Sequence, residues 1–409
     1  MAADPFAFTP EAEAVLRGPP PGGGYPPHPR ELDSPEAKMR RVREWEKLFP
    51  DTPQAGKISY LYPATPARVV ERWLAIGSNI APELEAEEPL FRPEPGRCAL
   101  FPLRDEELFA FRKTLERLHW VAQEVDLSRD KGDFEGVGEA DRRLVESVLG
   151  FFSIADELVL EGLDGRLARA LPTKEAAFYL RAQADQECVH SEAYSLQILE
   201  AIPLERREEI FEAVRTSALV GRMADWVRWW VLGRHAAADL FAAMAFIEGV
   251  MFSGFFAALH HYRGANLFPG ITGLNEFICR DEGVHTMFWC FILTKRLISR
   301  PTAATVTAIA RETVSLSCDF FTEALPEAVG GFSAALVNQY VRYAADSVAV
   351  QAGYEAIYGE TNPFPFMDSL ALNEVAKTNF FEASTSSYQN IGVEGALAFR
   401  VATAPLEEP

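Results

Sequence analysis

The chain has 409 residues, of which 48% are apolar, and its formal net charge is −20. This length and apolar content allow one large hydrophobic core. Because nucleic acids and anionic membranes would repel so acidic a protein, we expect neither as a partner.

The N-terminal part of the chain is predicted to stand apart from that core. A Pro/Gly-rich cluster between Gly18 and Pro29 favours disorder, so we interpret 1–56 as an extension and 57–97 as an arm packed on the remainder. The basic stretch 37–48 fits either a short docking helix or a solvated charged turn, and the turn is favoured. No basic segment followed by an apolar run opens the chain, so no secretory signal is expected.

The rest of the chain predicts an all-α protein. Apolar residues recur at helical spacing in eight segments, and prolines lie at or near the joints, as expected for a residue that interrupts helix interiors. The predicted helices span 105–126, 139–169, 173–200, 205–232, 235–262, 271–298, 302–324 and 333–358. The prolines at the joints are Pro172, Pro203, Pro269, Pro301 and Pro326. We therefore expect a four-helix bundle extended by additional helices.

Two Glu-x-x-His pairs, Glu187–His190 and Glu282–His285, form the most informative motif. A spacing of three residues places both side chains of a pair on one helix face. Both pairs lie in long segments with an apolar stripe. Two such pairs, with one carboxylate from each of two further helices, form a dinuclear metal site inside a four-helix bundle.

The two further carboxylates are expected on apolar helices, where an acid has no other reason to lie. Segment 236–259 is nearly all apolar and long enough to span a membrane, yet it contains Asp239 and Glu248. A lone carboxylate is costly in hydrocarbon or in a protein core unless it is neutralised, paired or metal-bound. We therefore favour a buried helix with Glu248 facing a metal. The second candidate is Asp156, which also reads as a surface acid beside Glu157.

Four carboxylates and two imidazoles suit iron or manganese, whereas six ligands exceed the usual tetrahedral set of zinc, the runner-up. The predicted ligands are Asp156, Glu187, His190, Glu248, Glu282 and His285. None of the five cysteines forms a Cys-x-x-Cys pair, so we interpret them as reduced, buried thiols in a cytoplasm-like compartment. A third pair, Glu116–His119, lies among charged residues and is interpreted as a solvated helix face without metal.

At this point the chain resembles the small, radical-generating subunit of class I ribonucleotide reductase, from about Glu88 to Gly392. The matching segments fall in the family's order and look most like its eukaryotic or large-DNA-virus branch. They are Glu88-Pro-Leu, Trp120-x-x-x-Glu124-Val-Asp-Leu-Ser-Arg-Asp130, His190-Ser-Glu-Ala-Tyr-Ser-Leu196, Glu248-Gly-x-x-Phe-Ser-Gly254, Arg280-Asp-Glu-Gly-Val-His285, Phe321-Thr-Glu-Ala-Leu-Pro326, Asn362-Pro-Phe and Lys377-Thr-Asn-Phe-Phe-Glu382. The resemblance implies a ferritin-like bundle, a homodimer, and two iron ions or a manganese–iron pair held by the six ligands.

Tyr194 follows His190 by four residues and shares a helix face with it and with Glu187. It matches the tyrosine that, in this family, becomes a stable radical when the reduced metal pair reacts with dioxygen. Its alternative reading is a core tyrosine with a bonded hydroxyl. The residues that match the family's apolar wall around this tyrosine, and that core packing explains equally well, are Phe252, Phe256 and Ile278.

The resemblance also implies a path for the radical to a separate large subunit. Trp120 matches its first tryptophan, Asp281 the carboxylate that links this tryptophan to metal-bound His190, and Tyr388 a relay tyrosine. Asp281 also reads as the ordinary hydrogen-bond partner of a ligand histidine, and Tyr388 as an exposed residue without a role. The tail 386–409 is expected to be flexible and to dock on the large subunit, although it lacks the terminal phenylalanine of cellular relatives.

The sequence thus predicts the small subunit of an aerobic ribonucleoside-diphosphate reductase, an oxidoreductase active only with its large subunit. Its ferritin-like domain is expected to span 98–385. One alternative is a radical-silent, metal-binding homologue with a regulatory role, which the altered tail keeps open. Another is a ferritin-like di-iron oxygenase or oxidase, against which Asp156 and Tyr388 argue. The expected location is the cytoplasm, or the host-cell cytoplasm for a viral protein.

Overall fold

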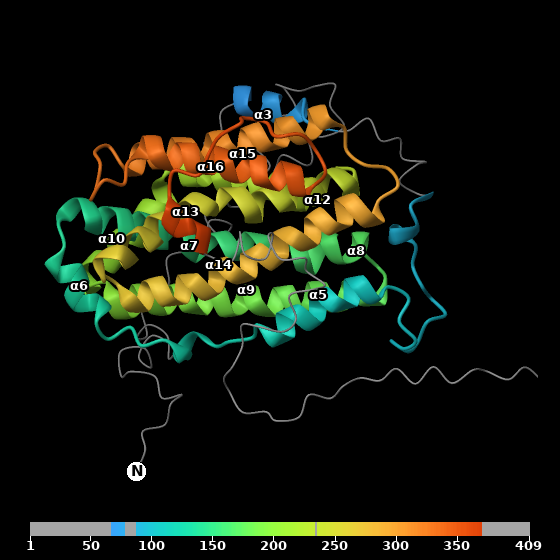
Figure 1. The fold of residues 1–409 in the computed structure, drawn as a ribbon, viewed down its shortest axis with the longest axis horizontal. Coiled ribbons are helices and arrows are strands. Elements are labelled where there is room, and N and C mark those ends of the chain that lie inside the picture. Colours follow the sequence, from blue (N-terminus) through green and yellow to red (C-terminus); the bar gives the residue numbers. More distant parts are fainter. Residues whose placement is uncertain (1–66, 78–86, 234, 370–409) are drawn as a thin grey trace, which may run out of the picture.

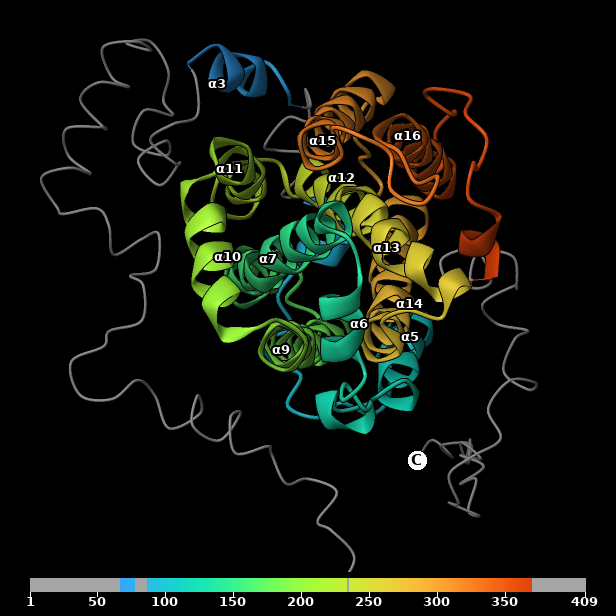
Figure 2. The same cartoon turned by 90° about the vertical axis from the view of Figure 1, so that its left-hand side faces the viewer.

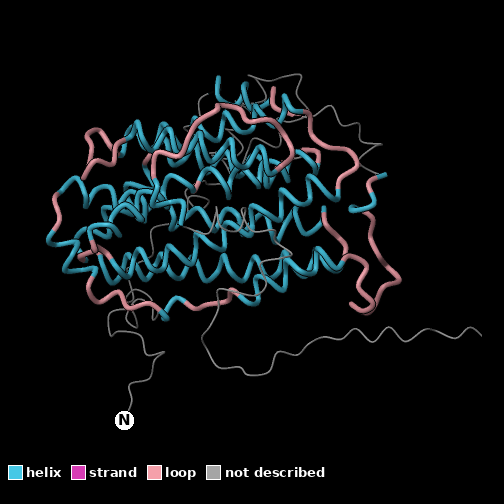
Figure 3. Tube along the Cα trace, viewed as in Figure 1, coloured by secondary structure: helices cyan, strands magenta, loops and turns pink. Residues whose placement is uncertain are grey.

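The computed structural model describes residues 67–77, 87–233 and 235–369. Within these ranges all regular elements are helices (Figure 3), and the one extended pairing is an isolated bridge between Val329 and Phe332. The predicted all-α class is therefore confirmed. The basic stretch 37–48 and Tyr388 lie outside the described residues.

Four long helical segments form the centre of the molecule and run side by side (Figure 1). Figure 2, which looks along them, shows these segments around a common interior. They are α7 (Glu139–Gly162), α9 (Lys174–Ala201), the pair α12 (Ala237–Phe246) and α13 (Ser253–His260), and α14 (Pro269–Phe291). This is the expected four-helix bundle.

Additional helices cover the outside of the bundle (Figure 2). α5 (Glu106–Arg117) packs on α9 and α14, α10 (Leu204–Thr216) and α11 (Ala218–Leu232) pack on α7, and α15 (Ala303–Ala324) and α16 (Ala334–Gln351) pack on α12 and α13. The shorter elements are α3 (Ala67–Leu74), η2 (Pro89–Phe91), η3 (Ala122–Glu124), α6 (Asp130–Gly136), η4 (Leu163–Leu167), α8 (Ala168–Ala170), η6 (His261–Ala265), η7 (Ile292–Arg296) and η8 (Pro365–Ser369).

Three predicted helices differ from the observed ones. The segment predicted as 205–232 is two helices, because Ser217 has extended backbone and its hydroxyl caps the second helix by accepting from the backbone N–H of Val220. The helix predicted over 105–126 ends at Arg117. The helix predicted over 333–358 ends at Gln351, two residues before a glycine with a φ of +77°.

The apolar segment around Glu248 lies inside the protein. Within the described part of the chain, the continuous helix Ala237–Ala265 alone is long and apolar enough to cross a membrane. Its most apolar window is completely buried, because α7, α14, α15 and α16 surround it. The buried-helix interpretation is therefore supported over a membrane span.

The short helix α3 is fastened to the outer face of α15 and α11 (Figure 2). The Trp73 indole is buried against Trp226 and Trp229, at ring-centroid distances of 5.2 and 6.1 Å, and donates to Glu312 at 2.8 Å. The Arg72 guanidinium donates twice to the same carboxylate, at 2.6 and 2.7 Å. The Arg72–Glu312 ion pair and the buried Trp73 indole thus hold α3 on the bundle.

Candidate metal centre

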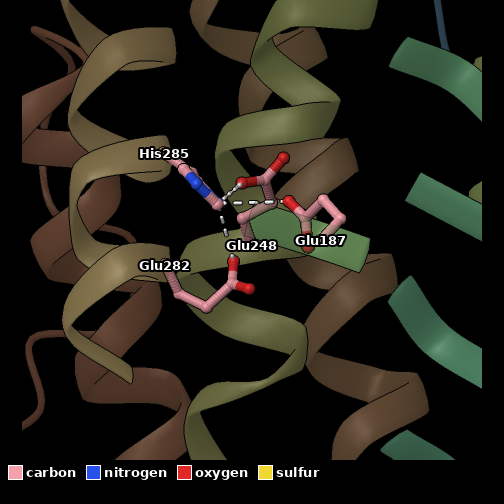
Figure 4. A group of neighbouring side chains, drawn as sticks. All are labelled: Glu187, Glu248, Glu282 and His285. Carbon is pink, nitrogen blue, oxygen red and sulfur yellow. Dashed lines mark ion pairs between the residues drawn. The ribbon is translucent and has the colours of Figure 1, made fainter. Parts of the chain in front are cut away.

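All six predicted ligands lie in the interior of the bundle, with at most 2% of any side chain exposed. α7 contributes one ligand, α9 two, the α12–α13 segment one and α14 two. The ligand atoms form two groups, and within each group all atoms lie within 4.8 Å of one another. Both groups include Glu187. The first group is Glu187, Glu248, Glu282 and His285 (Figure 4), and the second is Asp156, Glu187 and His190.

The two imidazoles define the two halves of the centre. His285 directs Nδ1 to carboxylate oxygens of Glu187 at 3.2 Å, of Glu248 at 3.2 Å and of Glu282 at 3.4 Å (Figure 4). His190 directs Nδ1 to the second oxygens of Glu187 and Glu282, both at 3.3 Å, and to Asp156 at 3.8 Å. Glu187 and Glu282 therefore present one oxygen to each half, which is the arrangement of bridging ligands between two metal ions.

Each imidazole is oriented by a partner on its other nitrogen. Nε2 of His190 lies 3.4 Å from Asp281 Oδ2, and Nε2 of His285 lies 3.0 Å from Gln186 Oε1. A partner of this kind selects the tautomer whose Nδ1 carries a free lone pair for a metal. Both Nδ1 atoms point into the carboxylate cluster.

Most of the inward-facing ligand atoms have no hydrogen-bond partner among the described residues. The atoms are Asp156 Oδ2, Glu187 Oε2, both carboxylate oxygens of Glu282, and Nδ1 of His190 and His285. Buried polar atoms are rarely left in this state, because each costs about 1–3 kcal/mol. Two divalent cations would satisfy these atoms and balance four carboxylate charges. The residues therefore fit a pair of divalent metal ions.

Burial and mutual charge shift the pKa values of the groups in this cluster. Burial raises the pKa of Asp156 well above its usual range and raises that of Glu248 to about 7. Against the effect of burial, the surrounding carboxylates raise the pKa of His190 and His285 well above the usual value. Metal binding must therefore displace protons from both imidazoles.

Glu248 lies in a π-helical turn, η5 (Ile247–Met251), which joins α12 to α13. The next residue, Gly249, faces α14 and α16 so closely that a Cβ there would lie 2.7 Å from the γ-methyl carbons of Thr286 and Val348. A single widened turn of this kind re-aims one side chain without ending the helix. Sequence periodicity did not predict this turn, because its flanking residues remain apolar on every side.

Two polar side chains that sequence reasoning missed hold Glu248 in place. The Gln183 amide donates to both Glu248 oxygens, at 2.9 and 3.1 Å, and to Glu187 at 3.2 Å. The Trp289 indole N–H donates to Glu248 Oε1 at 3.2 Å. Helical spacing could have identified both residues, since Gln183 precedes Glu187 by four residues and Trp289 follows His285 by four.

Tyr194 is fully buried, and its hydroxyl has no hydrogen-bond partner among the described residues. Its ring stacks on Phe152 at a centroid distance of 4.5 Å, and burial raises its pKa well above the usual value. Phe252 and Phe256 contact the same Phe152 ring, at 6.0 and 5.1 Å. The alternative reading, a core tyrosine with a bonded hydroxyl, finds no bonding partner among the described residues. Phe152, which sequence reasoning missed, completes its apolar surroundings.

Trp120, Asp281 and His190 form a continuous chain of contacts. The indole N–H donates to Asp281 Oδ2 at 2.7 Å, and the same oxygen lies 3.4 Å from His190 Nε2. The indole and imidazole rings stack at a centroid distance of 5.9 Å and an interplanar angle of 23°. Arg280 contacts the other oxygen of Asp281 at 3.2 Å, which fixes the direction of this carboxylate.

The third Glu-x-x-His pair, Glu116–His119, differs from the six buried ligands in its environment. Glu116 and His119 are exposed, and Glu116 pairs with Arg112 and Lys113 on the surface of α5. The interpretation as a solvated helix face is confirmed.

Comparison with known proteins identifies a single family. The family model described as "Ribonucleotide reductase, small chain" matches residues 97–363. The ribonucleoside-diphosphate reductase small chain of African swine fever virus (strain Badajoz 1971 Vero-adapted) is 37% identical over 319 residues, covering 77% of this chain and 96% of the relative. Small chain 1 of Saccharomyces cerevisiae is 38% identical over 314 residues, covering 76% and 78%.

Solved structures agree with the sequence comparison. A ribonucleotide reductase homodimer from Saccharomyces cerevisiae superposes with a TM-score of 0.65 at 26% identity, covering 70% of this chain and 91% of the solved chain. A putative class I ribonucleotide reductase from Bacillus halodurans shares the fold, with a TM-score of 0.59 at 19% identity, covering 65% and 100%.

Proposed function

The chain belongs to the ribonucleotide reductase small-chain family, and from this premise we propose that it uses a di-iron centre to form a stable radical on Tyr194. It is the small subunit of a ribonucleoside-diphosphate reductase, an oxidoreductase. The observation that carries the proposal is the complete set of six buried ligands beside a buried tyrosine, with most of their inward-facing atoms unpartnered among the described residues.

Each ligand has a role that follows from its position. Glu187 and Glu282 face both imidazoles and would bridge the two ions. The remaining ligands divide between the halves, with Asp156 and His190 on one and Glu248 and His285 on the other. Two bound ferrous ions would supply the electrons that start dioxygen reduction, and dioxygen, as the oxidant, would accept one further electron from Tyr194. A manganese–iron pair would suit the same oxygen-rich ligand set.

The surroundings of Tyr194 suit a radical that must persist. Among the described residues the hydroxyl has no partner from which a hydrogen atom can return, and the fully buried ring packs against Phe152. Exclusion of water also prevents side reactions of a reactive intermediate. Tyr194 is thus assigned to hold the radical, and Phe152, Phe252 and Phe256 to protect it.

The radical leaves by way of Trp120. Asp281 accepts a hydrogen bond from the Trp120 indole N–H and lies against Nε2 of His190, so it links the indole to the imidazole whose Nδ1 faces the carboxylate cluster. We assign this chain of contacts to electron and proton transfer toward a large subunit that binds the ribonucleotide. Tyr388 and the tail 386–409 are proposed to continue the path and to dock on that subunit. A homodimer in the cytoplasm is the proposed form.

The test is an electron paramagnetic resonance (EPR) spectrum recorded after ferrous iron and air are added to the apoprotein, with Tyr194→Phe alongside. Because the Tyr194 hydroxyl has no partner in the described part of the chain, we expect its removal to leave the packing intact. We expect a tyrosyl doublet in the unmodified protein and none in the variant. Diferric absorption without a radical in either protein would contradict the proposal and favour the radical-silent homologue, unless loading with manganese and iron restores the oxidation.

A further inference from the structure

The end of the bundle at which α10 lies (Figure 1) carries a groove between α10, the first turns of α7 and the end of α15. The groove encloses about 440 Å³. Apolar side chains from all three helices and from the loop after α15 line it, among them Ala140, Ile210, Val214, Ala324 and Val329. Neither a candidate metal ligand nor Tyr194 is among its lining residues, so the proposed chemistry does not use it.

The lining of this groove is acidic. Five carboxylates face two guanidinium groups, which leaves a net charge of −3. Two of the carboxylates, Glu139 and Glu146, pair with Arg206. The other three are exposed and have no ion pair or hydrogen bond within the part of the chain that the structure describes. They are Glu209, Glu323 and Glu327.

A second hollow extends the groove along α10. It encloses about 470 Å³ and shares Arg206 and Glu209 with the first. Phe134 and Glu205 also line it, so it repeats the combination of apolar and acidic side chains. Two joined hollows along one helix form an elongated groove, and an amphipathic helix lays its apolar face into a groove of this shape.

The basic stretch 37–48 has the complementary charge and pattern. It contains five Lys or Arg residues and two Glu residues, so its net charge is +3. In a helix, Arg40, Arg43 and Lys47 would share one face. Val42 and Trp45 would share another. A helix of this kind offers both apolar anchors and cations to an acidic groove.

The connection along the chain lets this stretch reach the groove. The described residues begin with α3, which Glu312 of α15 holds on the bundle. Glu323 in the groove follows Glu312 by eleven residues on α15, which is about 16 Å along the helix axis. Residues 49–66 can span up to about 60 Å when extended. The stretch therefore reaches the groove while α3 stays in place.

We propose that the basic stretch 37–48 docks as an amphipathic helix in this groove of its own chain. Its cations pair with the three carboxylates that lack a partner, and Val42 and Trp45 cover the apolar lining. The N-terminal extension is then attached to the bundle at two places, α3 and the groove. Because the paired charges lie at the surface, docking weakens as the salt concentration rises.

The experiment uses the full chain with a benzophenone amino acid in place of Trp45, irradiated at low and at high salt. We expect a cross-linked product with the mass of one chain. Digestion with trypsin should show position 45 joined to peptide 208–215, which contains Glu209, or to peptide 312–342, which contains Glu323 and Glu327. The yield should fall severalfold between about 0.05 and 0.5 M salt.

Charge reversal tests whether the two surfaces recognise each other. Reversing the stretch with Arg40→Glu/Arg43→Glu/Lys47→Glu should lower the cross-linking yield at least tenfold. Reversing the groove in the same protein should restore the yield, through Glu209→Lys/Glu323→Lys/Glu327→Lys. The matched control reverses three exposed acids that do not line the groove and should restore nothing. These substitutions are Glu106→Lys/Glu208→Lys/Glu355→Lys.

Several results would overturn this inference. One is the absence of a single-chain product from protein with the unmodified groove, or its appearance only when the large subunit is present. Another is a product with the mass of two chains, which would assign the groove to a second copy. A yield that charge reversal does not change, or that the control restores as well as the groove variant does, would also overturn it. Helix content is measured in every sample. The cross-linked positions and the salt dependence come from the unmodified groove, so they decide the outcome even where a groove variant does not fold.

Discussion

Replacing Glu175 by glutamine should loosen the anchor at the start of α9, the helix that presents two metal ligands and Tyr194. The Glu175 side chain is 1% exposed. It accepts two hydrogen bonds from Arg97, at 2.5 and 2.7 Å, and one from the backbone N–H of Arg104 at 2.8 Å. One carboxylate thus ties the segment before α5 to the first turn of α9.

The pKa of Glu175 indicates how much folding free energy the substitution should remove. Burial alone would raise it, but the hydrogen bonds from Arg97 and from the Arg104 backbone lower it from 4.5 to about 2. This fall in the pKa, from 4.5 to about 2, corresponds to about 3 kcal/mol of folding free energy. Because the folded-state pKa is depressed, this contribution is fully present above pH 4.5 and is lost as the pH falls through about 2.

The assay is denaturant unfolding of Glu175→Gln and the unmodified protein at one protein concentration, from pH 7 down to the lowest pH at which both fold. We expect a loss of about 3 kcal/mol at pH 7 that shrinks below pH 4.5. The control is Glu276→Gln, whose exposed pair with Arg263 is worth less than about 1 kcal/mol. A difference below about 1 kcal/mol at pH 7, or one that is constant with pH, would refute the reasoning.

Four further predictions concern the metal centre. Gly249→Ala places a methyl against α14 and α16, so it should destabilise the fold by about 1–3 kcal/mol and lower the metal bound per chain; an unchanged melting temperature and metal content would contradict this. Trp120→Phe removes the hydrogen bond to Asp281 but not the ligands, so diferric absorption should form while reductase turnover with the large subunit is lost; retained turnover would exclude the path. Glu116→Gln should leave metal content unchanged, because this residue lies on a solvated face; any loss of metal would overturn that reading. Because the pKa of both ligand imidazoles is raised, metal binding should release protons and weaken as the pH falls; a titration without proton release would show that the imidazoles are already neutral.

Much of the centre follows from the sequence, because helical periodicity converts spacing along the chain into position in space. The pairs Glu187–His190 and Glu282–His285 must each share a face, and an acid such as Glu248 within an apolar helix needs a partner inside the protein. These rules selected all six candidate ligands and predicted the bundle that holds them. Asp156 was the least certain from its own neighbours, since it also reads as a surface acid beside Glu157, and the family resemblance supported it.

Only the tertiary structure decided how these ligands are aimed and what surrounds them. At the π turn that contains Glu248, Gly249 packs closely against Thr286 and Val348, which are far away along the chain. The contacts of Gln183 and Trp289 with Glu248, and of Phe152 with Tyr194, join different helices as well. Spacing within one helix determines which residues share a face. Which face meets which across the bundle depends on helix packing, and local periodicity does not contain that information.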